Sequence, residues 1–122
     1  MKFTYISEIL ADKRFKLILN DSIEEETHRR NNRMVVYQSN GLDLRRNTFI
    51  RLDELGLITI EWLTAEFSLI HSKESKRTAH ERELISAMVD NAIMKTLEYY
   101  NNRPIEKAKW YFSRIFKTRN HE

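Results

Sequence analysis

The clearest hydrophobic pattern lies in the second half of the chain, where apolar residues recur at intervals of three and four. This spacing is typical of one buried face of a helix. The pattern follows Thr78-Ala79-His80-Glu81, which is a capping box. In such a box the Thr hydroxyl accepts a hydrogen bond from the Glu amide, and the Glu carboxylate accepts one from the Thr amide. The apolar positions are Leu84, Ile85, Met88, Val89, Ala92, Ile93, Leu97 and Tyr100. We therefore predict a central core helix that runs from this box to about Asn101.

A shorter helix is predicted directly before the core helix. Thr59 can cap it, and Glu61 places an acid in its first turn, where the helix dipole favours negative charge. It should end near Ser72. Because the polar stretch 72–77 holds neither Gly nor Pro, one continuous helix from Thr59 to Asn101 remains an alternative.

The middle of the chain predicts a helix from Asp43 to Leu55. Asp43 is a suitable N-cap, and Gly56 can take the left-handed conformation that ends many helices. Leu57 then stands where a hydrophobic contact usually accompanies such an ending.

Two more helices are predicted in the first forty residues. Ser22-Ile23-Glu24-Glu25 is a second capping box, which indicates a helix from Ser22 toward Tyr37, with Gly41 breaking the chain. Strand propensity in Met34-Val35-Val36-Tyr37 leaves a short hairpin open. The segment from Thr4 to Leu19 predicts the first helix, with an extended conformation as the alternative for its last five residues.

A last, basic helix is expected from about residue 104 to 118. Pro104 donates no amide bond and disfavours helical geometry at Arg103, so a new helix should begin with proline in its first turn. The total is five or six helices with at most one short hairpin. We therefore expect residues 1–122 to form a single all-α domain, an irregular helical bundle.

Composition narrows the chemistry that such a bundle can perform. The 122 residues include two Gly and no Cys, which excludes phosphate-binding glycine loops, dinucleotide fingerprints and thiol catalysis. His80 and Glu83 have a spacing that two metal ligands could use, but a solvated pair in a first helical turn is the better interpretation. We expect no enzyme, no cofactor, no metal and no small-molecule substrate. Without a signal peptide or a span-length apolar run, we expect a soluble, cytoplasmic protein with no membrane partner.

Positive charge gathers near the C-terminus. The net charge is +3, yet residues 103–119 alone hold six Lys and Arg against one acid. The cations Lys107, Lys109, Arg114 and Lys117 alternate with aromatic residues, a composition that suits RNA or single strands, where bases stack on rings and phosphates pair with cations. An amphipathic helix with buried rings and snorkelling lysines is the alternative.

A second basic run is His28-Arg29-Arg30-Asn31-Asn32-Arg33. Its arginines, Arg29, Arg30 and Arg33, can bond phosphates and base edges. The alternative is a solvated helix face, in which Glu25 and Glu26 pair with the arginines four residues on.

A third basic run carries a resemblance to a known family. The sequence from Arg45-Arg46-Asn47 to Leu55-Gly56-Leu57-Ile58 resembles the end of a winged-helix recognition helix. In that family the helix lies in the major groove and a β-wing follows, so the resemblance implies DNA contacts from Arg45 and Arg46. It covers fourteen residues, because the following segment, 59–72, lacks the glycine turn of a wing and predicts a helix instead.

Two functional hypotheses follow from these features. In the first, the protein is a small, non-enzymatic partner of nucleic acid that contacts the phosphate backbone through its Lys and Arg patches. In the second, it is a protein-interaction or assembly subunit, self-associating or capping a partner, with no nucleic-acid contact. Aromatic residues are enriched where interfaces carry their energy, and the candidates for such an interface are Trp62, Tyr99, Trp110 and Tyr111.

Overall fold

Helices make up the fold, as the hydrophobic pattern predicts. The structure, a computed structural model, describes residues 3–31 and 41–101. Within these ranges no residue is in a β-strand, and a single all-α domain is confirmed. The helices are α1 (Ile6–Leu10), α2 (Lys13–Asn31), α3 (Gly41–Glu54), α4 (Ile60–His71) and α5 (Ala79–Asn101).

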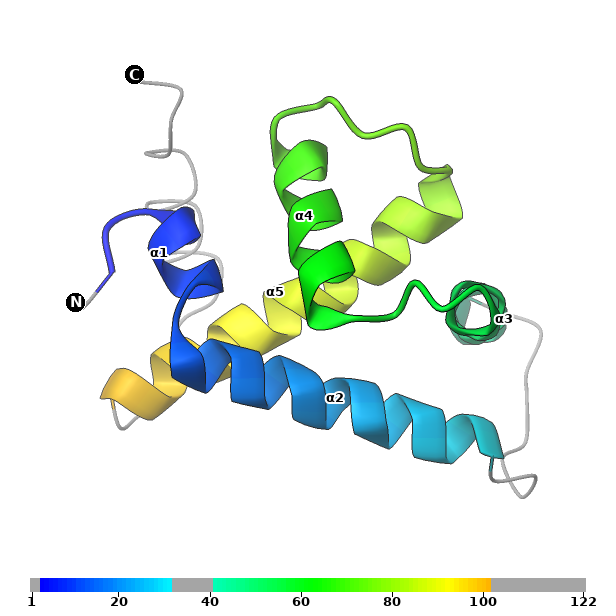
Figure 1. Cartoon of the computed structure of the whole chain (residues 1–122), viewed down its shortest axis with the longest axis horizontal. Helices are drawn as coiled ribbons and strands as arrows, with labels where there is room; N and C mark the ends of the chain where they lie inside the picture. The colour runs from blue at the N-terminus through cyan, green and yellow to red at the C-terminus, as the bar shows by residue number, and fades with distance from the viewer. Residues whose placement is uncertain (1–2, 32–40, 102–122) are drawn as a thin grey trace.

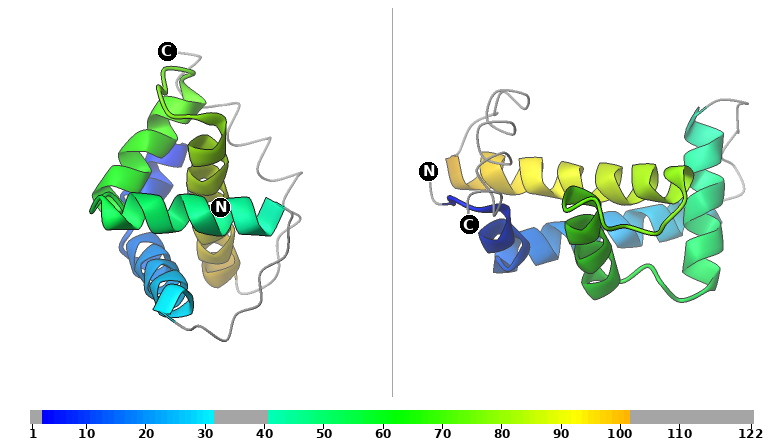
Figure 2. Two further views of the ribbon diagram at one scale, coloured as in Figure 1. Left: turned by 90° about the vertical axis from the view of Figure 1, so that its right-hand side faces the viewer. Right: turned by 90° about the horizontal axis from the view of Figure 1, so that it is seen from above.

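The long helix α5 is the centre of the arrangement. It contacts each of the other four helices, most extensively α2, which runs antiparallel to it (Figure 1). Figure 2 shows α3 lying across one end of this pair and α1 at the opposite end. The central core helix predicted from residues 78–101 is therefore confirmed.

The hydrophobic core is built around the apolar face of α5. Ile85, Ile93 and Leu97 are fully buried there. The other helices supply the side chains that pack against them, including Ile9, Phe15, Leu19, Leu52, Leu63 and Phe67. Every helix thus contributes to one continuous core, and the removal of this apolar surface from water is its main source of stability.

The predicted ends of α3 and α4 are confirmed by their hydrogen bonds. At the end of α3, Gly56 has a φ of 75°, and the amides of Gly56 and Leu57 bond back to the carbonyls of Asp53 and Leu52, at 2.9 and 3.0 Å. This is a Schellman ending. Thr59 caps α4 by accepting from the Trp62 amide at 3.1 Å.

The chain leaves the helical path between α4 and α5, so the alternative of one continuous helix is wrong. Lys73, with a φ of 63°, takes the left-handed position that closes α4. The capping box then starts α5 as predicted. The Glu81 amide donates to the Thr78 hydroxyl at 3.2 Å, and the Thr78 amide donates to the Glu81 carboxylate at 3.0 Å.

The predicted boundaries in the first half of the chain are wrong. One helix from Thr4 to Leu19 and another from Ser22 are replaced by the short α1 and by α2, which runs through Ser22 without a break. The true cap of α2 is Asp12, whose carboxylate accepts from the amides of Arg14 and Phe15 at 2.9 and 3.2 Å. Packing of Phe15 and Leu19 on α5 extends the helix across the apparent capping box, and it also excludes the extended alternative for residues 15–19.

The start of α3 also differs from the prediction. This helix begins at Gly41, so Asp43 lies inside it and is not its N-cap. The possible strand at residues 34–37, the expected helix end near Tyr37 and the expected helix from 104 to 118 all lie outside the described residues.

Candidate functional site

The arginines of α3 are engaged in ion pairs with neighbouring helices. Arg45 lies 3.3 Å from Glu83 of α5, and Arg46 lies 3.9 Å from Glu26 of α2. The side chain of Arg46 is only 13% exposed. These contacts join α3 to α5 and α2. Arg45 and Arg46, the arginines of the winged-helix resemblance, therefore have carboxylate partners within the chain.

A third arginine of α3 reaches the first turn of α5. Arg51 pairs with Glu81 at 3.3 Å, and Arg77 approaches the same carboxylate at 3.8 Å. Burial raises the pKa of Glu81, but the hydrogen bond from Thr78 and the two guanidinium groups outweigh it and hold the pKa below its ordinary value. Glu81 is 8% exposed, so one buried carboxylate joins α3, α5 and the connection before α5 through two arginines that remain partly exposed.

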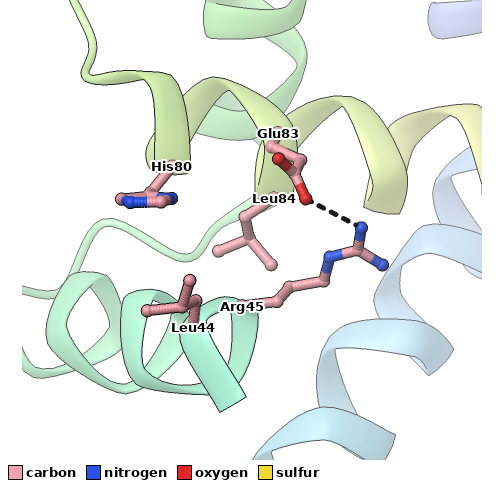
Figure 3. Close-up of a pocket in the computed structure, with 5 residues that line it drawn as sticks. All are labelled: Leu44, Arg45, His80, Glu83 and Leu84. Carbon is pink, nitrogen blue, oxygen red and sulfur yellow. Dashed lines mark hydrogen bonds and ion pairs between the residues drawn. The ribbon is translucent and has the colours of Figure 1, made fainter. Parts of the chain in front are cut away.

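A small pocket lies between α3 and α5 (Figure 3). Its volume is about 120 Å³, and its lining residues are Leu44, Arg45, His80, Glu83 and Leu84. Figure 3 shows the Arg45–Glu83 ion pair at one side and His80 at the other, with Leu84 between them and Leu44 below His80. The volume is well below the several hundred Å³ of typical ligand sites, and the positive and negative charges of its lining neutralise each other, so we assign this pocket no ligand.

The C-terminal end of α5 has a different character. Tyr99 is 53% exposed, and the Arg14 guanidinium lies 4.1 Å from its ring centroid while donating to its hydroxyl at 3.1 Å. Tyr100 turns inward, where it packs edge-on against Phe3 and donates to Asp12 at 2.9 Å. Lys95 is exposed one turn before Tyr99, on the same face of the helix.

The cations at this end make no ion pair with a carboxylate of residues 3–31 or 41–101. Arg14 contacts Tyr99, and Lys13 and Lys95 extend into solvent. Sequence reasoning selected Tyr99 but missed Arg14 and Lys95, because the two basic residues are separated from each other by 81 positions and no local pattern connects them.

The other predicted site residues divide into three groups. Trp62 is half-buried against the core, and the Arg77 guanidinium lies 5.9 Å from its ring centroid. These contacts give Trp62 a structural role. Arg29 and Arg30 belong to α2, but the structure describes only their backbone and not their side chains. The remaining candidates lie outside the described residues, namely Arg33, Lys107, Lys109, Trp110, Tyr111, Arg114 and Lys117.

Comparison with known proteins identifies no relative. No protein-family model, no curated protein and no solved structure matches the chain. None of the helices in the described part of the chain combines the length and apolar character required to cross a bilayer. Nor do the described residues bring three or more His, Asp or Glu side chains into a group that could hold a metal ion.

Proposed function

We propose that this protein is a non-enzymatic partner of nucleic acid and that its basic C-terminal segment, residues 103–119, supplies the main phosphate contacts. The observation that carries the proposal is the separation of charge along the chain. The described helices and their connections contain 13 Lys and Arg against 16 Asp and Glu, whereas residues 103–119 contain six against one. A basic segment attached to a mildly acidic domain is a common arrangement for binding polyanions.

The ion pairs of α3 sharpen this assignment. Arg45 and Arg51 lie 3.3 Å from carboxylates, and the Arg46 side chain is largely buried beside Glu26. Contact with phosphate would require Arg46 and Arg51 to leave carboxylates that are only 31% and 11% exposed, whereas the exposed Arg45–Glu83 pair is the weakest obstacle. Phosphate binding is therefore better assigned to the C-terminal segment than to α3.

The protein-interaction hypothesis has less support from the described surface. Its large exposed apolar side chains are Tyr5, Leu17, Leu44, Leu55, Leu69 and Tyr99. No helix within residues 3–31 and 41–101 carries more than one of them, so none presents the apolar stripe that helical assembly surfaces use.

Fluorescence anisotropy of the full chain with labelled DNA and RNA oligonucleotides tests the proposal. Binding through four to six phosphates should weaken by about 10²- to 10³-fold between about 50 and 200 mM salt. The variant K109E/R114E should lose most of the affinity. The matched variant K73E/K76E, which reverses two exposed lysines between α4 and α5, should lose much less. Absence of binding at about 50 mM salt, or equal losses in the two variants, would contradict the proposal.

A further inference from the structure

We infer that Tyr99, Arg14 and Lys95 form a contact for single-stranded nucleic acid on the helical domain, with an unpaired base stacking on Tyr99. We call these three residues the Tyr99 patch. The inference rests on the proposed function and adds to it the type of nucleic acid that is bound and a second place of contact.

The exposure of Tyr99 is the first observation behind this inference. Its neighbour Tyr100 packs against Phe3 and hydrogen-bonds to Asp12, so the end of α5 is anchored without Tyr99. Tyr99 remains 53% exposed, and among the described residues Arg14 and Tyr100 make a hydrogen bond or ring contact with it. The guanidinium over its ring holds the side chain in place, which lowers the entropy that would be lost when a base stacks on it.

The charges around Tyr99 are the second observation. Arg14 of α2 lies over the ring, and Lys95 is exposed one turn before Tyr99 on the same face of α5. Neither cation forms an ion pair with a carboxylate within the described ranges. The nearby Asp12 carboxylate is occupied by the amides of α2 and by the Tyr100 hydroxyl. Glu98 is rotated by about 100° around the helix from Tyr99. An aromatic ring between cations is the combination that binds single strands without sequence preference.

The position of the patch along the chain is the third observation. The basic segment that begins at residue 103 starts four residues after Tyr99. A strand held by that segment is therefore delivered close to the patch at a high effective concentration. Near the N-terminal end of α5, by contrast, Arg45, Arg51 and Arg77 pair with Glu81 and Glu83.

The decisive experiment compares a labelled oligothymidylate of about 20 nucleotides with a labelled duplex of equal length, using the full chain and fluorescence anisotropy. Tyr99→Ala should weaken binding of the single strand by about 5- to 100-fold. It should change binding of the duplex by less than about twofold, because paired bases are not free to stack on the ring. Tyr99→Phe keeps the ring and should stay within about twofold of the wild type. Leu55→Ala, at an exposed apolar position near the other end of the molecule, is the control for general surface effects.

The role of charge is tested separately by single reversals. Lys95→Glu should weaken binding of the single strand several-fold more than Lys76→Glu, which makes the same change at an exposed position in the α4–α5 connection. Circular dichroism and thermal unfolding should show that every variant keeps the wild-type fold.

The possible outcomes separate this inference from the proposed function. If the wild type binds neither oligonucleotide, both are wrong. If the wild type binds but Tyr99→Ala leaves binding of the single strand within about twofold, or weakens the strand and the duplex equally, the Tyr99 patch is wrong and the basic segment remains the binding region.

Discussion

The two ends of α5 use charged side chains in opposite ways. At the N-terminal end, three arginines pair with Glu81 and Glu83, and the buried Glu81 carboxylate also caps the helix. At the C-terminal end, Asp12 is bound by amides and by Tyr100, whereas Arg14 faces an exposed tyrosine and forms no ion pair with a described carboxylate. The first arrangement holds helices together. The second leaves Tyr99 and Lys95 exposed.

This contrast concerns only the charged and polar side chains, because the core is fully buried near both ends of α5. Ile85 and Leu97 are both fully buried, one toward each end of α5. The difference between the ends therefore predicts different responses to polar substitutions and similar responses to apolar ones.

The largest effects are expected from truncation of these two core residues. Ile85→Ala and Leu97→Ala should each lower the free energy of unfolding by about 3 kcal/mol, because each leaves a cavity in a closely packed interior. Urea unfolding followed by circular dichroism measures both values. A loss below about 1 kcal/mol for Leu97→Ala would show that the core does not extend to the C-terminal end of α5, which would undermine the comparison.

The next largest effect is expected from Glu81→Gln. This variant removes the charge shared by Arg51, Arg77 and the α5 cap, so near pH 7 it should lower the free energy of unfolding by about 2 kcal/mol. Glu83→Gln is the matched control, because its side chain is 62% exposed and its ion pair with Arg45 should contribute less than about 0.5 kcal/mol.

The Glu81 effect should also depend on pH. Burial raises its pKa, but the Thr78 amide and the two arginines outweigh this and hold the pKa below the ordinary value of 4.5. The stabilisation is therefore complete above pH 4.5 and is lost as the pH falls through the lower pKa of the folded state. The difference between the wild type and Glu81→Gln should shrink in that acid range. A constant difference from pH 7 down to pH 3 would rule out the ionised Glu81 as the stabilising group.

How much could be predicted from the sequence also differs along the chain. The boundaries around α4 and α5 were predictable because Thr59, Gly56 and the box Thr78–Glu81 are local signals whose bonds lie within a few residues. Ser22 carries an equally good local signal, but the packing of α2 along α5 overrides it. The Asp12 cap of α2 is equally local, because its carboxylate accepts from the amides of Arg14 and Phe15.

The candidate site was less predictable than the fold. The exposed Tyr99 follows from its position beside the apolar stripe of α5. The partners of Arg45, Arg46 and Arg51 do not, because they lie 20 to 38 residues away and meet them only after the helices have packed. For the same reason, a single sequence could not distinguish the arginines of α3, which pair with carboxylates, from Arg14, which contacts Tyr99.

The smallest effect is expected at the C-terminal end of α5, from Tyr100→Phe. Burial, followed by the hydrogen bond to Asp12, raises the pKa of Tyr100 above its ordinary value of 10.0. A raised pKa of this kind stabilises the folded state fully below pH 10, and the stabilisation is lost as the pH rises through the higher pKa of the folded state. The two ends of α5 should therefore fail at opposite extremes, Glu81 in acid and Tyr100 in alkali. The loss in Tyr100→Phe at pH 7 should be smaller than in Glu81→Gln, because Asp12 still caps α2 without the phenol.

Thermal unfolding between pH 8 and pH 11 measures this loss of stability in alkali. Below pH 10 the wild type should unfold at a higher temperature than Tyr100→Phe, and this difference should shrink as the pH rises above 10. Tyr5→Phe, which removes an exposed phenol that makes no contact with Asp12, is the control and should follow the wild-type curve. Parallel curves for the wild type and Tyr100→Phe would mean that the Tyr100–Asp12 bond does not anchor the end of α5. The exposure of Tyr99 would then need another explanation than the anchoring of its neighbour.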